Sequence, residues 1–135
     1  MYKNILIPLV FDSETDHSKV VALAKSLAAP DAGITLLHVI ELAPNYVISY
    51  IPEEATNRIR DEVSGDMDAL TKQIPGAQSL IVTGHAGRSI VDIAKDKNMD
   101  LIIVQSHRPG FEDYFLGSTA SYIVRRAQCS VHVVR

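Results

Sequence analysis

The sequence predicts an α/β protein with one doubly wound sheet of five parallel strands and helices on both faces. Three observations carry this prediction. Short, continuous apolar runs recur along the chain, which is typical of parallel strands covered by helices on both faces. Segments with apolar residues at helical spacing separate these runs, so strands and helices alternate. The length of 135 residues and the hydrophobic content of 47% suit a single domain, which we expect to span residues 1–135.

Five apolar runs are the expected strands. They are Asn4 to Val10, Ile34 to Ile40, Gln78 to Thr83, Leu101 to Val104 and Val131 to Val134. A helix separates each run from the next, so each pair forms a right-handed crossover unit. We expect the spatial strand order 3-2-1-4-5.

The first two expected helices lie before and after the second strand. One spans His17 to Ala29, with Thr15 or Asp16 as its cap and the sequence Pro30 to Gly33 at its end. The other follows Pro52 and runs to about residue 74, and its charged residues form a solvated face. Its apolar stripe consists of Ile59, Val63, Met67 and Leu70. Between them, Glu41 to Tyr50 has no clear period and we expect a long loop.

The last two expected helices are shorter. One covers Ser89 to Lys97 after a turn at residues 84–87, and Asn98 can end it in the left-handed conformation. The other opens at Gly117, directly before the final strand. Each of these helices therefore connects two parallel strands that follow one another in the sequence.

Composition argues against several classes of function. The formal net charge of -3 gives no basic field for nucleic acid. The run from Ile5 to Leu9 contains Pro8 and is too short for a signal peptide or membrane insertion. The single cysteine, Cys129, cannot form an internal disulfide, which fits a reducing compartment. We therefore expect a cytoplasmic protein.

Topology predicts the place of a ligand before any motif is considered. Open α/β sheets bind ligands outside the carboxyl ends of their strands, where the strand order reverses. With the order 3-2-1-4-5 the reversal lies between strands one and four. The segments Pro8 to Asp12 and Gln105 to Thr119 would then meet in one crevice.

The second of these segments has the chemistry of a phosphate site. Gly117 lets an anion approach the backbone, while Ser118 and Thr119 offer hydroxyls and N–H groups at a helix N-terminus. His107 and Arg108 add donors at the mouth of the same loop. An ordinary helix start, a histidine bonded within its loop and a free surface arginine are the alternative readings of these residues.

No catalytic or metal-binding constellation has recognisable spacing. A nucleophile with an adjacent base, an acid–base pair or a ligand cluster would be needed. Four histidines stand apart in the sequence, each without a second ligand four residues on, and packing or surface positions account for them. Cys129 precedes the last strand in an apolar setting and is expected to be a buried, inert thiol. The separated histidines are His17, His38, His85 and His132.

Several segments together resemble the universal stress proteins over essentially the whole chain. The most specific are Leu116-Gly117-Ser118 and the C-terminal stretch from Val124 to Arg135. The small single-domain branch is closest, because its fourth strand also runs into Ser-His-Arg-Pro, here Ser106 to Pro109. Further matching segments are Asn4 to Pro8, Leu36 to Val39, Gly84 to Ala86 and Asp100 to Val104.

The resemblance implies a nucleotide site whose pattern this chain matches in part. Nucleotide-binding members have Gly, two residues, Gly, nine residues, Gly and then Ser or Thr. Gly117 and Ser118 match the end of that pattern, whereas Gln105 and Arg108 replace the first two glycines and eight residues, not nine, follow Arg108. The turn from Ser106 to Gly110 can still offer backbone N–H groups and side-chain donors.

The opposite side of the implied site also departs from the family. Binding members carry Pro-x-Asp after the first strand, where this chain has Pro8, Leu9 and Val10. Asp12 could take over the role of the missing carboxylate, and Val39 aligns with a residue that lines the adenine pocket. These residues complete the expected nucleotide-binding set.

The implied function is regulation in the stress response. ATP or AMP, with Mg2+ as a candidate companion ion, would bind between strands one and four, reorder the loops Glu41 to Tyr50 and His107 to Phe115, and change contacts with an unidentified regulatory protein. A homodimer would form through Val131 to Val134, an apolar edge that needs cover. Two alternatives stay open: a homodimeric interaction protein that binds no nucleotide, and a slow nucleotide hydrolase.

Overall fold

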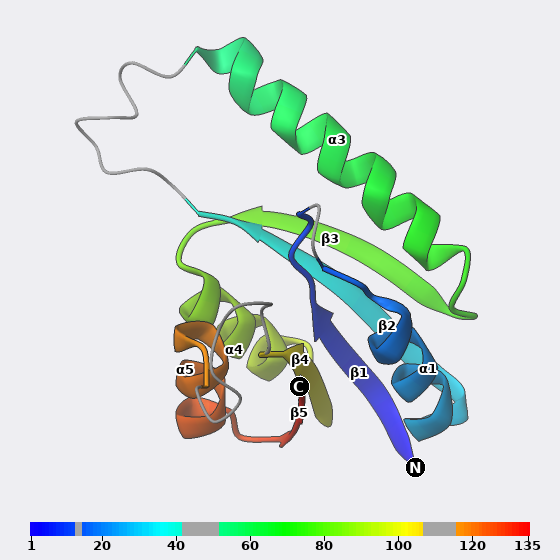
Figure 1. Cartoon of the computed structure of the whole chain (residues 1–135). Helices are drawn as coiled ribbons and strands as arrows, with labels where there is room; N and C mark the ends of the chain where they lie inside the picture. Colours follow the sequence, from blue (N-terminus) through cyan, green and yellow to red (C-terminus); the bar gives the residue numbers. More distant parts are fainter. Residues whose placement is uncertain (13–14, 42–51, 107–115) are drawn as a thin grey trace.

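The computed structural model describes residues 1–12, 15–41, 52–106 and 116–135, and the expected α/β fold is confirmed (Figure 1). Five parallel strands form one sheet in the order β3-β2-β1-β4-β5. The strands are β1 (Tyr2–Pro8), β2 (Ala28–Ile40), β3 (Ala77–Thr83), β4 (Leu101–Gln105) and β5 (Ser130–Val134). The helices are α1 (Ser18–Leu27), α3 (Glu53–Thr71), α4 (Ala86–Asp96) and α5 (Ser118–Arg126).

Alternation along the central strand divides the core into two layers. Ile5 and Ile7 of β1 face α1 and α3, whereas Leu6 between them faces α4 and α5, and all three side chains are fully buried. Burial on both faces explains why this strand is a continuous apolar run rather than an alternating one. The apolar faces of the four helices supply the outer half of each layer.

Strand β2 begins earlier than the sequence suggested. The stretch from Pro30 to Gly33 was expected to end the first helix as a turn, but α1 ends at Leu27 and β2 starts directly at Ala28. Proline disfavours the α conformation in the residue before it, which keeps this junction extended. The register with β1 is irregular there, because Tyr2 pairs with Ala28 and Asn4 with Gly33.

Helix α4 also begins earlier, at Ala86 rather than Ser89. The reason is local: Nδ1 of His85 accepts the N–H of Arg88 at 3.1 Å and so caps the first turn. Asn98 has a φ of 53°, in agreement with the expected left-handed position after this helix.

Helix α3 is only partly covered by the sheet. Val63, Met67 and Leu70 of the expected apolar stripe are buried, but the side chain of Ile59 is 52% exposed. Figure 1 shows why: the N-terminal half of α3 extends beyond the sheet. Ile59 is therefore not a core residue, contrary to the sequence prediction.

No helix in the described part of the chain is long and apolar enough to cross a membrane.

Candidate functional site

The middle of β1 pairs with the amino end of β4, and the two strands part toward their carboxyl ends. Their register pairs are Ile5 with Leu101 and Leu6 with Ile102. Both strands lie wholly within the described residues, and they have no register pairs beyond these two. The chain leaves β1 toward β2 and leaves β4 toward β5, on opposite sides. The strand order thus reverses here, at the place where open α/β sheets bind ligands.

The first group of expected site residues follows the end of β1. Pro8 pairs with Leu37, and the N–H of Leu9 donates to the carbonyl oxygen of Leu37 at 2.8 Å, so the pairing with β2 continues one residue past the strand. Leu9 is buried, while the side chain of Val10 is 49% exposed. The chain therefore turns out of the sheet at Val10.

Two histidines hold the carbonyl groups of this turn. Nδ1 of His38 lies 2.9 Å from the Leu9 oxygen, and Nε2 of His17 lies 3.0 Å from the Val10 oxygen. The ring of Phe11 contacts both imidazoles, with centroids 5.1 Å from His17 and 5.7 Å from His38. Each histidine nitrogen that faces a carbonyl oxygen acts as a donor. From the sequence we expected both histidines at packing or surface positions, and their contacts with these carbonyl groups were not predicted.

Carboxylates shape the next few residues. Asp12 accepts both the N–H and the hydroxyl of Thr15 on one oxygen, Oδ1, at 2.7 and 2.6 Å. Asp16 accepts the N–H and the hydroxyl of Ser18 at 2.9 and 3.0 Å. The cap position of α1 is however His17, which makes no side-chain capping bond, so the expected cap at Thr15 or Asp16 is wrong. These bonds to Ser18 lower the pKa of Asp16. The β1 side of the crevice is therefore acidic.

The second group of expected site residues joins the end of β4 to the start of α5. The N–H of Ser106 donates to the carbonyl oxygen of Val134 at 2.9 Å, and the hydroxyl oxygen of Ser106 accepts the N–H of Gly117 at 3.1 Å. Ser118 is exposed and Thr119 half-buried in the first turn of α5. The N–H groups of a first turn have no acceptor within the helix, so this end carries partial positive charge.

One side chain of the second group reaches the segment that follows the first group. Nε2 of Gln105, the last residue of β4, donates to the carbonyl oxygen of Asp16 at 2.9 Å. The bond joins residues that lie 89 positions apart in the chain. We call it the Gln105 bridge. It spans the place where β1 and β4 part.

The remaining expected residues are placed less directly. Val39 pairs with Val82, is half-buried, and packs against the core layer of α4 and α5. It lies near the carboxyl end of β2, two residues beyond Leu37, which pairs with Pro8. His107, Arg108 and Gly110 lie outside the described residues.

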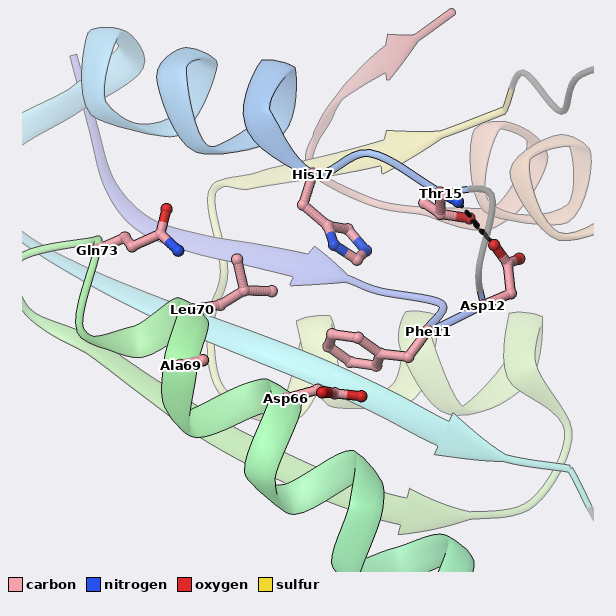
Figure 2. Close-up of a pocket in the computed structure, with 8 residues that line it drawn as sticks. All are labelled: Phe11, Asp12, Thr15, His17, Asp66, Ala69, Leu70 and Gln73. Atoms are coloured by element: carbon pink, nitrogen blue, oxygen red, sulfur yellow. Dashed lines mark hydrogen bonds between the residues drawn. The ribbon is translucent and has the colours of Figure 1, made fainter.

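A separate hollow lies beside the crevice, between the start of α1 and the C-terminal half of α3 (Figure 2). It is open to solvent and has a volume of about 540 Å³. Of the expected site residues that the structure describes, Asp12 alone lines it. The lining residues are Phe11, Asp12, Thr15, His17, Asp66, Ala69, Leu70 and Gln73.

Among the described residues there is no group of three or more His, Cys, Asp or Glu side chains that could hold a metal ion.

Comparison with known proteins places the chain among relatives of one kind. The model of the universal stress protein family matches residues 1–135. Universal stress protein A homolog 2 of Coxiella burnetii is 31% identical over 140 residues, which cover 99% of this chain and 95% of that protein. The solved structure of a Methanocaldococcus jannaschii universal stress protein, 26% identical, superposes with a TM-score of 0.83 over 99% of this chain and 96% of that one.

Two more distant solved structures share the fold and contain adenine nucleotides. A universal stress protein in complex with cAMP is 20% identical, with a TM-score of 0.64 over 99% of this chain and 97% of that one. The Archaeoglobus fulgidus universal stress protein in complex with dAMP is 15% identical, with a TM-score of 0.66 over 99% of this chain and 98% of that one.

Proposed function

The chain belongs to the universal stress protein family, and from that membership we propose that it is a cytoplasmic regulatory protein that binds an adenine nucleotide. The ligand is ATP or AMP, with Mg2+ as a companion ion of the triphosphate. Its place is the crevice between the carboxyl ends of β1 and β4. Members of the family that have been solved with cAMP and dAMP support this choice of ligand.

The contact between Ser106 and Gly117 carries the proposal. Because the Ser106 hydroxyl accepts the Gly117 N–H, the end of β4 and the N-terminus of α5 lie together at the edge where β1 and β4 part. The accepting hydroxyl keeps its own proton, which is available to a phosphate oxygen. The phosphate would bind Ser106, Gly117, Ser118 and Thr119 at the positive end of α5.

Charge sets the orientation of the nucleotide. Asp12 and Asp16 make the β1 side of the crevice acidic, so phosphate oxygens are disfavoured there and ribose hydroxyls are suitable partners. The ribose would therefore lie toward Asp12 and the segment from Pro8 to Val10. The half-buried side chain of Val39 supplies an apolar contact for the base. His107, Arg108 and Gly110 complete the proposed set from the same loop.

Direct binding measurements test this function. The chain has no Trp and 5 Tyr, so nucleotide released by heating pure protein would dominate the absorbance at 260 nm. In calorimetric titrations we expect ATP or AMP to bind the wild type, and Ser118→Ala to bind about three- to tenfold more weakly because one hydrogen bond is lost. Ser26→Ala, which removes an exposed serine of α1, is the matched control.

A second function is favoured by the Gln105 bridge, which already occupies the place where the strands part. In that case the protein is a homodimeric interaction protein that binds no nucleotide. It is the correct alternative if heat-released supernatant contains no nucleotide and neither ATP nor AMP binds at millimolar concentration. Phosphate release from ATP that Ser118→Ala abolishes would instead assign slow hydrolysis.

Partner contacts complete the proposal. Strand β5 is at one end of the sheet order, so its outer edge has no strand beside it within the described chain. Exposed strand edges are normally covered or blocked. The homodimer would pair two copies along Val131 to Val134, and the nucleotide would alter contacts with a regulatory protein through the loops at the crevice.

A further inference from the structure

The Gln105 bridge is anchored firmly at both ends. On the β4 side, Gln105 pairs with Val134, and the next residue, Ser106, donates its N–H to the Val134 oxygen at 2.9 Å. On the other side, Asp16 is fixed by the two bonds that its carboxylate accepts from Ser18 at the start of α1. The 2.9 Å bond between Nε2 of Gln105 and the Asp16 oxygen thus connects the end of β4 to the segment just before α1.

The bridge connects Gln105 of the second group to Asp16, which follows the first group four residues after Asp12. Strands β1 and β4 pair no further than Leu6 and Ile102, so their carboxyl ends would otherwise stand apart. A ligand that lies between these ends must either displace the Gln105 amide or bind outside it. Displacement leaves the Asp16 oxygen without this donor, so the nucleotide binds more weakly.

We infer that Gln105 determines the nucleotide affinity of this protein: its bridge to Asp16 restrains the loop after β1, and the bridge must open for a nucleotide to enter the crevice. This inference rests on the proposed nucleotide binding and adds to it the residue that opposes binding. A protein of this kind responds to high nucleotide concentrations only, because part of the binding free energy is used to open the bridge.

Variants at this position separate the restraint from other roles of the side chain. Gln105→Ala removes the bridge. Gln105→Asn keeps an amide but is one methylene too short to span the same distance. Because the bond is exposed, water replaces it and both variants are expected to fold. Gln78→Ala, at an exposed glutamine of the distant edge strand β3, is the matched control.

The test combines ATP titration with hydrogen exchange of the ligand-free proteins. We expect Gln105→Ala and Gln105→Asn to bind ATP about three- to tenfold more tightly than the wild type, the factor that corresponds to one net hydrogen bond. We also expect faster exchange of the amides of residues 15–18 in both variants. Gln78→Ala should match the wild type in both measurements.

The possible failures are distinguishable. If the wild type binds ATP and the Gln105 variants bind equally well or more weakly, the inference is overturned and the proposed function stands. Unchanged exchange at residues 15–18 overturns it as well. If no protein binds at millimolar ATP while exchange is faster in the Gln105 variants, the proposed function fails and the restraint is supported. If the Gln105 variants bind ATP and the wild type does not, the inference is supported.

Discussion

Asp100 fastens the amino ends of the two central strands. Its carboxylate accepts the N–H of Lys3 at 2.8 Å and that of Asn4 at 2.9 Å, and its own N–H donates to the Asn4 oxygen at 2.8 Å. The amide of Asn4 in turn donates to the oxygens of Lys97 and Asn98. These bonds extend the short pairing of β1 and β4 on the side opposite the crevice.

Replacing Asp100 with alanine should lower the free energy of unfolding by about 1–3 kcal/mol, since two bonds from backbone N–H groups to a carboxylate are lost in a partly exposed setting. Urea denaturation followed by circular dichroism measures the change. Asp92→Ala, at an exposed aspartate of α4, should stay within about 0.5 kcal/mol of the wild type. Equal stability of the two variants would contradict the role of Asp100.

Cys129 permits a second test at the scale of one residue. The side chain of Cys129 is half-buried, not buried as the sequence predicted. This partial burial raises the pKa of its thiol, and the charge of Asp100 contributes in the same direction. The folded protein therefore holds the proton more tightly than the unfolded chain does. Stability from this group is present below the usual pKa of a thiol and is lost as the pH rises above that value.

At pH 8 we expect iodoacetamide to alkylate Cys129 more slowly in the native protein than in protein unfolded by urea, because the thiolate is the reactive form. Mass spectrometry gives an unambiguous rate, since the chain has one cysteine. Cys129→Ser should incorporate no label. A native rate equal to the unfolded rate would show that burial does not protect the thiol.

Single residues were the hardest part to predict. Gly117 and Ser118 could be recognised as the start of a helix, because a glycine before a helix is a local pattern. The bonds of His17 and His38 to neighbouring carbonyls depend on two elements meeting in space. A histidine within the apolar run of the second strand was the one available signal.

At the scale of elements, α4 and α5 lie close together at Gly87. A Cβ atom there would lie 2.8 Å from Cγ and Cδ1 of the Tyr122 ring. The same ring contacts the imidazole of His85, with centroids 5.5 Å apart, and carries the Arg126 guanidinium 4.7 Å from its centroid. The ring therefore has little freedom to move away.

Gly87→Ala should destabilise the protein by about 1–3 kcal/mol through this overlap, although alanine is the better helix former. Gly65 in the middle of α3 is the matched control, because no atom apart from its chain neighbours and the nearby backbone of its own helix lies within 4 Å of the position that a methyl group would take there. Gly65→Ala should stabilise by about 0.5–1 kcal/mol. The urea midpoints of the two variants measure both changes in stability. We expect the midpoint to fall in Gly87→Ala and to rise in Gly65→Ala.

The kind and order of elements followed from apolar periodicity, whereas several boundaries did not. The start of α4 depends on the capping bond of His85, and the start of β2 on an extended junction before Pro30. How far α3 reaches over the sheet is set by packing between elements. The apolar stripe in the sequence indicates which face of α3 is buried. It does not indicate that Ile59 lies outside the buried part of that face.

At the scale of the whole molecule, the proposed homodimer predicts twice the mass of one 14.8 kDa chain in light scattering at micromolar concentration. His132 is exposed on β5, so His132→Lys should place like charges across the two-fold axis and shift the protein toward monomer. Gln78→Lys on the opposite edge is the control. A monomer mass for the wild type would rule out the dimer at that concentration.

The strand order could be predicted because it follows from topology, and so could the point between β1 and β4 where that order reverses. The side-chain link across the crevice could not, since Gln105 and Asp16 are brought together by the completed fold. The same applies to the hollow beneath α3, which depends on how that helix lies against α1.

The short pairing of β1 with β4 also has a mechanical meaning. The sheet is continuous from β3 to β1 and again from β4 to β5, but its two parts meet in register only at Ile5 with Leu101 and Leu6 with Ile102. We expect the described sheet to open first along this seam under tension, and to open from its carboxyl end, because the bonds of Asp100 hold β1 and β4 together at the amino end. That opening would begin at the edge where the proposed nucleotide site lies.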